Sequence, residues 1–177
     1  LPQIVAFVLV AVLAITPIFA NINSNVNRRN NWIADEYAKN MLDTPRDNSV
    51  VFTNGDNDTY PLWFEQVVKN YRTLNREEKK GVMVCNLSLL NTPWYIKQMR
   101  SYGVPIGLTD KEIDNLVPVR LENNEVLYIR DLIIRSIICA SAGIKCERSV
   151  LYATSDEFTS LVLNNYKADS INVYFSV

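Results

Sequence analysis

The chain begins with an unbroken apolar segment, LPQIVAFVLVAVLAITPIFA, over residues 1–20. Gln3 and Thr16 are its only polar side chains, and none is charged. About 20 apolar residues are needed for a helix to cross the hydrocarbon core of a bilayer. A signal peptide would have a basic start and a small-residue cleavage site, and a buried core helix rarely stays uncharged for so long. We therefore predict a transmembrane helix, kinked or ended near Pro17.

Polarity changes abruptly after this segment. Residues 21–31 are rich in asparagine and have little periodicity, so they are interpreted as a connector. Residues 32–177 then carry the mixed pattern of a soluble α/β domain. Arg28 and Arg29 favour a cytoplasmic location by the positive-inside rule, but no loop on the other side of the segment is available for comparison.

Within the soluble part, short apolar runs alternate with helical patterns. Residues 49–53 and 82–87 are predicted to be buried strands, each followed by a polar loop and a helix with proline in its first turn. We place the cap of the first helix at Thr59 or Tyr60. Helical patterns predict helices over 33–42, 93–99 and 126–142, the last ending at Gly143. Two further helices are expected after the capping boxes Thr109–Glu112 and Thr154–Glu157. Strands are predicted over 149–153 and 171–177. This order predicts a mostly parallel, Rossmann-like α/β domain.

Composition removes several classes of function. The chain has 177 residues and a formal net charge of -1, so it lacks the basic surface that binds nucleic acid. It contains no histidine, which removes the commonest general base and zinc ligand. Cys85, Cys139 and Cys146 fit no zinc spacing, and the last two could pair only if the turn after Gly143 folds back. We predict no metal site and no cofactor.

Polar side chains gather directly after the first predicted strand. Asn54, Asp56, Asn57 and Asp58 stand at its carboxyl end, where open α/β sheets bind ligands. We predict ligand binding at these four residues. Two other interpretations stay open: asparagine, glycine and aspartate are typical of a tight turn and a helix cap, and Asp-x-Asp can hold a divalent cation.

A second cluster follows the next strand, over residues 86–95. Because parallel strands end at the same edge, its residue Asn91 is expected to share one polar cleft with the first loop, and the two helices to lie on one face. Trp94 and Tyr95, together with Trp63, are candidates for stacking on a sugar ring. Burial of these three aromatic side chains in the core is the alternative.

One further charged group was considered. Asp131 stands between Arg130 and Arg135 at helical spacing. We interpret the three as a solvated ion pair network, which contributes little to stability.

Two stretches resemble a known family. Residues 52–63, FTNGDNDTYPLW, resemble the signature of the bacterial membrane family called domain of unknown function 2723, and residues 84–98, VCNLSLLNTPWYIKQ, resemble its second signature. Weaker resemblance lies at 27–42 and 127–132, and the whole covers most of residues 5–153. The link over residues 66–80 departs from the family's pattern, and the tail beyond Ala153 matches poorly.

The resemblance implies a polytopic membrane protein with a C-terminal soluble region. Eukaryotic relatives, similar to transmembrane protein 260, are protein O-mannosyltransferases that resemble the GT-C class. That class uses lipid-linked sugar donors and an acidic residue in an early loop, which has no counterpart in this chain, so no catalytic residue is carried over. GT-C enzymes also do without a nucleotide-sugar Asp-x-Asp, which argues against the metal interpretation of Asp56 and Asp58.

The chain starts at Leu1 rather than methionine, and we expect it to be a fragment. We predict the last membrane helix and extracytoplasmic domain of a GT-C-like glycosyltransferase of the inner membrane, with the domain in the periplasm. The domain would assist acceptor or glycan binding, while a lipid-linked sugar and an acceptor protein would also engage the missing N-terminal region. The alternative is a non-catalytic binding or assembly module of the cell envelope. Whether this chain is itself an enzyme is left open.

Overall fold

A computed structural model describes residues 2–21, 31–75, 77–78, 80–145, 147–165 and 172–176. The chain divides into two compact units, residues 1–36 and 37–177, which are described separately. Arg28, Arg29 and Cys146 lie outside the described residues, so the sidedness signal and the pairing of Cys139 with Cys146 have no structural account.

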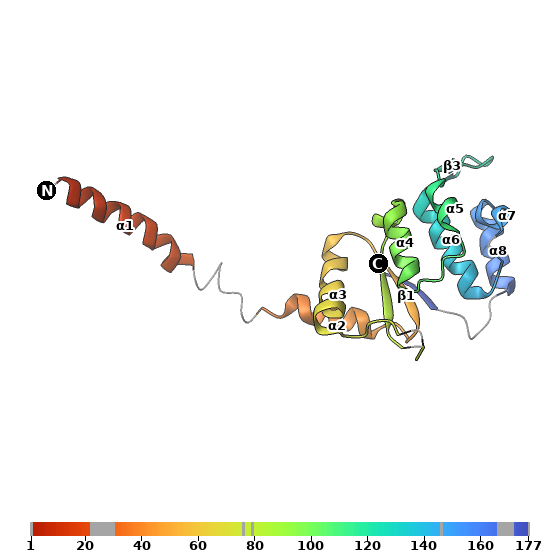
Figure 1. Cartoon of the computed structure of the whole chain (residues 1–177), viewed down its shortest axis with the longest axis horizontal. Coiled ribbons are helices and arrows are strands. Elements are labelled where there is room, and N and C mark those ends of the chain that lie inside the picture. Colours follow the sequence, from red (N-terminus) through yellow and green to blue (C-terminus); the bar gives the residue numbers. More distant parts are fainter. Residues whose placement is uncertain are drawn as a thin grey trace. The chain divides into compact units, whose positions relative to one another are not determined.

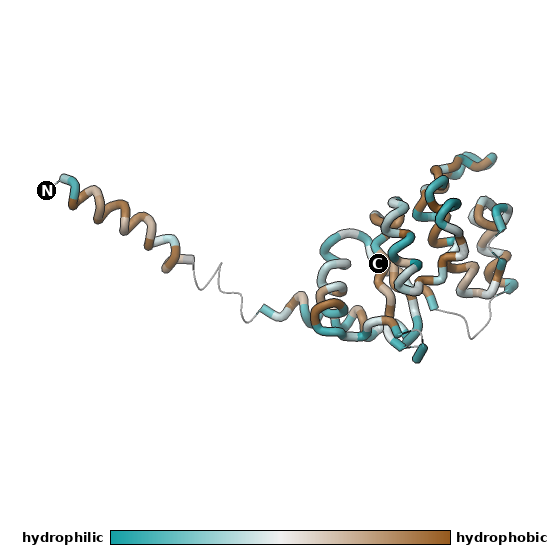
Figure 2. The backbone as a smooth tube through the Cα atoms, in the orientation of Figure 1, coloured by the Kyte–Doolittle hydropathy of each residue, from teal (hydrophilic) through white to brown (hydrophobic). Residues whose placement is uncertain are grey.

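The first unit contains one long apolar helix. Helix α1 runs over Pro2–Asn21, with Pro17 inside it, so the helix continues beyond the proline. Its side chains are almost all exposed. Most of its residues are hydrophobic, as the colour of the tube in Figure 2 shows. It is long and apolar enough to cross a membrane. Thr16 donates its hydroxyl hydrogen to the Val12 carbonyl at 2.6 Å, which satisfies the helix's polar side chain internally.

The second unit is built on a small parallel sheet. Strands β1 (Ser49–Thr53), β2 (Val82–Asn86) and β5 (Asn172–Phe175) lie in the order β2-β1-β5, and β1 pairs in parallel with both neighbours. The predicted strands over 49–53 and 82–87 are confirmed. Three strands show a mixed α/β fold with a parallel sheet, although they do not establish a Rossmann-like arrangement.

Helices cover both faces of this sheet (Figure 1). On one face, Val51, Val82 and Val84 pack with side chains of α2 (Ile33–Asp43) and α3 (Asp56–Lys69). On the other face, Val50 and Phe52 pack with side chains of α4 (Pro93–Ser101) and α6 (Ile129–Ala142).

The prediction that the helices after β1 and β2 share a face is therefore wrong. The chain leaves β1 in one direction to form β2, then returns past β1 to form β5. Right-handed crossovers in opposite directions place their helices on opposite faces of the sheet.

Other elements complete the second unit. They are the 3₁₀ turn η2 (Leu89–Asn91), α5 (Asp110–Asp114), the antiparallel pair β3 (Val119–Arg120) and β4 (Val126–Leu127), α7 (Arg148–Leu151) and α8 (Ser155–Asn165). Both predicted capping boxes form, and Gly143 ends α6 with a φ of 70°.

Two local predictions were wrong. The strand expected at 149–153 is the helical turn α7, because a short apolar run has no periodicity that separates strand from helix. The helix expected over 126–142 begins only at Ile129, because Val126 and Leu127 pair with β3.

Helix α3 also begins earlier than predicted. Its N-cap is Gly55, and the Thr59 N–H already donates to the Gly55 carbonyl at 3.2 Å. Pro61 therefore lies inside the helix. Asp56 and Asp58 occupy the first turn, where carboxylates stabilise the positive end of the helix dipole. The loop predicted after the first strand, residues 54–58, is thus mostly helix.

The interpretation of Arg135 as part of a solvated network was wrong. Its side chain is buried, and its guanidinium donates to the carbonyls of Leu151 and Ala153 at 3.0 and 2.6 Å. Arg130 and Asp131 do form a partly exposed ion pair of 3.5 Å. Arg135 is buried because its acceptors are backbone carbonyls 16 and 18 residues away, which the local sequence pattern does not reveal.

Candidate functional site

The carboxyl ends of β1 and β2 lie at the same edge of the sheet, because Thr53 is in register with Asn86. A buried polar network joins the two ends there. The Thr53 and Thr59 hydroxyl oxygens lie 2.7 Å apart, Thr59 donates to the Gly55 carbonyl, and the Asn86 side-chain amide donates to Thr59 at 2.8 Å. The Thr59 hydroxyl thus donates once and accepts twice, which uses its full capacity.

Sequence reasoning missed this network. Thr53, Thr59 and Asn86 are all buried, and all three are polar. The sequence signal that could have indicated it is a polar residue at the end of an apolar strand, as Asn86 is. Because its members bond to one another and to nearby backbone, the network joins the strand ends and leaves few polar atoms for a ligand.

The predicted polar residues after β1 lie at this edge and are mostly exposed. Asn54, Asp56 and Asn57 are exposed, and Asp58 accepts a 3.1 Å hydrogen bond from the Tyr37 hydroxyl. Burial and this bond to Asp58 both raise the pKa of Tyr37. These contacts place Asp58 between α2 and α3, while the other three side chains face solvent.

Asn91 is engaged elsewhere. Its side-chain oxygen accepts from the Arg130 N–H at 3.2 Å, and its side-chain nitrogen donates to the Ser88 carbonyl at 3.3 Å. The residue therefore joins the loop after β2 to the start of α6. Such contacts favour a structural role, and ligand binding by Asn91 stays a prediction, as it does for the residues after β1.

The predicted aromatic residues do come together, at the outer edge of β2. A groove of about 540 Å³ lies between α3 and α4, and we call it the edge groove. The described residues that line it carry no charge; they are Trp63, Gln66, Val67, Thr73, Leu74, Met83, Val84, Leu89, Trp94, Tyr95, Gln98, Met99 and Tyr102.

Three aromatic rings of the edge groove contact one another. The ring centroids of Trp63 and Tyr95 are 6.4 Å apart, and those of Trp94 and Tyr95 are 5.6 Å apart in an edge-on arrangement. Tyr95 is buried, and its hydroxyl accepts from the Asn86 N–H at 3.0 Å. Burial raises the pKa of Tyr95, so the phenol stays neutral. Trp94, by contrast, is exposed and can meet a ligand.

Polar side chains protect the strand beside the edge groove. Gln66 donates to the outward Val82 carbonyl at 2.7 Å, and the Trp63 indole N–H lies 3.5 Å from the Val84 carbonyl. These bonds occupy the acceptors that an added strand would need. The groove is consequently better suited to side-chain and ring contacts than to extension of the sheet.

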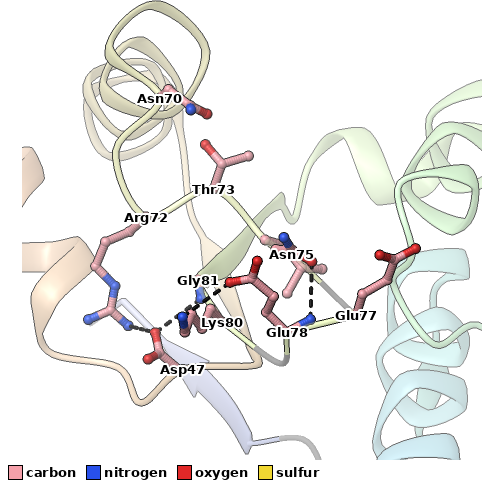
Figure 3. Close-up of a pocket in the computed structure, with 10 residues that line it drawn as sticks. Asp47, Asn70, Arg72, Thr73, Asn75, Glu77, Glu78, Lys80 and Gly81 are labelled. Atoms are coloured by element: carbon pink, nitrogen blue, oxygen red, sulfur yellow. Dashed lines mark hydrogen bonds and ion pairs between the residues drawn. The ribbon is translucent and has the colours of Figure 1, made fainter.

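A second cavity, of about 820 Å³, lies at the amino ends of β1 and β2, around the loop before β2 (Figure 3). Asp47 accepts there from Arg72 at 2.9 Å and from the Gly81 N–H at 3.0 Å, and Lys80 pairs with Glu78 at 3.1 Å. One of these ion pairs joins the loop to the segment before β1, and the other lies within the loop. Neither cavity is lined by Asn54, Asp56, Asn57, Asp58 or Asn91.

Metal chemistry receives no support from the described part of the chain, where histidine, cysteine, aspartate and glutamate form no group of three that could hold an ion. Cys85 is buried in the core, which raises the pKa of its thiol to about 12. A thiol with that pKa is neutral and unreactive at physiological pH.

Comparison with known proteins identifies the soluble part. Neither a curated protein nor a solved structure matches the chain. A family model described as TMEM260-associated domain 2 matches residues 34–168, which include all the elements from α2 to α8 apart from the first residue of α2. The chain therefore belongs to the family of TMEM260-associated domain 2 proteins.

Proposed function

We propose that this chain supplies the last membrane helix and the extracytoplasmic domain of a GT-C-like membrane glycosyltransferase. The domain assists acceptor or glycan binding and carries no catalytic residue. Membership of the TMEM260-associated family and the apolar helix α1 support this assignment. The sugar donor is a lipid-linked mannose in this proposal, and the acceptor is a protein.

The observation that carries the binding role is the edge groove. Its lining combines aromatic rings with neutral polar groups, such as the Gln98 amide and the Tyr102 hydroxyl, and includes no charged side chain among the described residues. Sugars present apolar ring faces and neutral hydroxyl groups, which aromatic faces and neutral donors complement. A phosphate group would find no cation there. The groove is thus better matched to a glycan or glycosylated acceptor than to a nucleotide.

Sugar transfer by the full-length parent tests the proposal. Radiolabelled lipid-linked mannose is supplied with an acceptor protein, and the variant Trp94→Ala is compared with Trp32→Ala. Both tryptophans are exposed, 60% and 58%, so neither change should unfold the domain. Loss of one stacking contact, worth about 1 kcal/mol, should raise KM for the acceptor roughly fivefold in Trp94→Ala alone.

Three results would argue against this function or a part of it. A folded parent that transfers no sugar contradicts the enzyme assignment. Capture of envelope proteins without sugar turnover would instead support a binding or assembly module. Equal KM values for the two tryptophan variants would remove the edge groove from acceptor binding while leaving the enzyme assignment intact.

The proposed location is the inner membrane with the domain in the periplasm. A reporter fused after Val177 that is active only in the cytoplasm should give no signal. Activity of that reporter would reverse the orientation, in agreement with Arg28 and Arg29 as a cytoplasmic signal.

A further inference from the structure

Helix α3 has an inverted distribution of polar and apolar side chains. Among its buried residues are Glu65 and Gln66, whereas Phe64, Val67 and Val68 are exposed. Val67 is the most exposed of these, at 82%. A helix on the surface of a soluble domain ordinarily shows the opposite arrangement.

The contacts of the buried side chains explain the inversion. Gln66 turns inward to donate to the Val82 carbonyl, and the Glu65 carboxylate accepts from the Lys69 ammonium at 2.7 Å. The sheet edge thus takes the Gln66 side chain, and Lys69 neutralises Glu65 within the helix. As a consequence, Val67 and Val68, the two residues that follow Gln66 along α3, face away from the sheet.

The exposed residues form a continuous surface. Tyr60, Phe64, Val67 and Val68 are spaced at i, i+4, i+7 and i+8, which places them on one side of the helix. We call these four residues the α3 outer face. Val67 also lines the edge groove, so the α3 outer face adjoins that groove. Exposed apolar patches of this kind mark sites of interaction.

We propose that the α3 outer face rests in the interfacial layer of the lipid bilayer. Two features of the chain select lipid as the occupant. The first is proximity: residues 22–32 separate α1 from α2, and eleven residues reach at most about 40 Å. Once α1 crosses a bilayer, the domain is held beside its surface. This inference rests on the membrane insertion of α1, which is part of the proposed function, and does not require sugar transfer.

The second feature is side-chain chemistry. From Tyr60 to Val68 the only charged residue is Glu65, and it is buried, so this stretch of α3 presents no exposed charge. Tyr60 has the apolar ring and polar tip that are typical of membrane interfaces. Lys69 borders the α3 outer face, with its ammonium 5.4 Å from the centre of the Phe64 ring, and it neutralises the Glu65 carboxylate.

Nitroxide labels measure this directly. The full chain, in a Cys146→Ser background, is reconstituted one copy per phosphatidylcholine nanodisc and labelled at Val67→Cys. The matched control is Leu163→Cys on α8, an apolar helical position that is 73% exposed. Collision with a water-soluble nickel chelate should be about threefold weaker at position 67 than at 163, while collision with oxygen should be stronger.

A second variant guards against effects of the label itself. Phe64→Asp with Val68→Asp places charges on exposed positions, so the domain should stay folded, as circular dichroism can verify. Nickel access at position 67 should then rise to the level at 163. Equal nickel access at positions 67 and 163 without these aspartates would overturn the proposal. Protection at position 67 that appears only when other segments of the parent are present would also overturn it. Protection that survives both aspartates would also contradict it.

Discussion

The side-chain amide of Asn86 donates a 2.8 Å hydrogen bond to the hydroxyl of Thr59, and both residues are buried. This bond ties the end of β2 to the first turns of α3. Replacing Thr59 with valine keeps the shape but leaves the Asn86 amide and the Thr53 hydroxyl without their common partner, while the Gly55 carbonyl keeps its bond from the N–H of residue 59. Because buried unsatisfied groups cost about 1–3 kcal/mol each, we expect a loss of about 3 kcal/mol in the free energy of unfolding.

Urea unfolding of the chain in detergent micelles, followed by near-UV circular dichroism, measures this loss. Thr159→Val is the matched control, because the Thr159 hydroxyl also donates to a carbonyl four residues earlier, at 2.7 Å, but is exposed. It should change stability by no more than about 0.5 kcal/mol. Similar values for the two variants would show that the network at the sheet edge contributes little.

The buried carboxylate of Glu65 yields a second prediction. One oxygen accepts from Lys69, and the other has no hydrogen-bond partner among the described residues. Removing the ammonium by Lys69→Met leaves a buried charge. Because Lys69 is 35% exposed and water screens the pair, we expect a loss of about 2 kcal/mol rather than the larger values of fully buried pairs.

Lys97→Met controls for the loss of a lysine that is 34% exposed but pairs with the exposed carboxylate of Asp114. That change should cost less than about 0.5 kcal/mol. Glu65→Met should leave stability unchanged or raise it by about 1 kcal/mol, because an apolar side chain of similar size avoids the desolvation of the carboxylate. A large loss in Glu65→Met would mean that Glu65 makes contacts beyond this pair.

Arg135 is expected to hold α7 and α8 against α6. Its guanidinium donates to two carbonyls and to the Ser155 hydroxyl, and it lies 4.8 Å from the centre of the Phe158 ring. Arg135→Met should cost about 3 kcal/mol, and Arg135→Lys should recover little because lysine lacks the planar fork. Hydrogen exchange of the α8 amides should rise in both variants. Full protection in Arg135→Lys would show that charge alone is sufficient.

The two capping boxes predict a dependence of stability on pH. Hydrogen bonds from Thr109 and Thr154 lower the pKa values of Glu112 and Glu157 below those in the unfolded chain. The stabilisation by the two ionised glutamates is present above about pH 4.5, the ordinary pKa of glutamate. It is lost as the pH falls through the lower pKa values of the folded state. Stability should therefore fall between pH 5 and pH 3.

The double variant Glu112→Gln with Glu157→Gln tests this origin, because glutamine can accept the same bonds but does not titrate in that range. The variant should be less stable than the unmodified chain at pH 7 and should lose less stability on acidification. Unfolding measured at pH 7, 5 and 3 gives both quantities. Identical pH profiles would assign the acid sensitivity to other carboxylates.

Sequence alone determined the elements whose causes are local. The apolar run of α1, the two buried strands, both capping boxes and the end of α6 at Gly143 follow from neighbouring residues, and the structure contains them all. It also grouped Trp63, Trp94 and Tyr95 as candidates for one site, and the structure brings them together at the outer edge of β2.

Tertiary structure decided which polar side chains are available to a ligand. Asn91 is bonded by the Arg130 N–H, 39 residues away, and Thr59 by Asn86, 27 residues away. Helix α3 turns Gln66 inward for the same reason, because its partner, the Val82 carbonyl, lies 16 residues away and is brought alongside by packing. The spacing of apolar residues along a segment predicts its secondary structure. A hydrogen-bond partner depends instead on which distant segment the fold brings alongside, so only the folded chain identifies it.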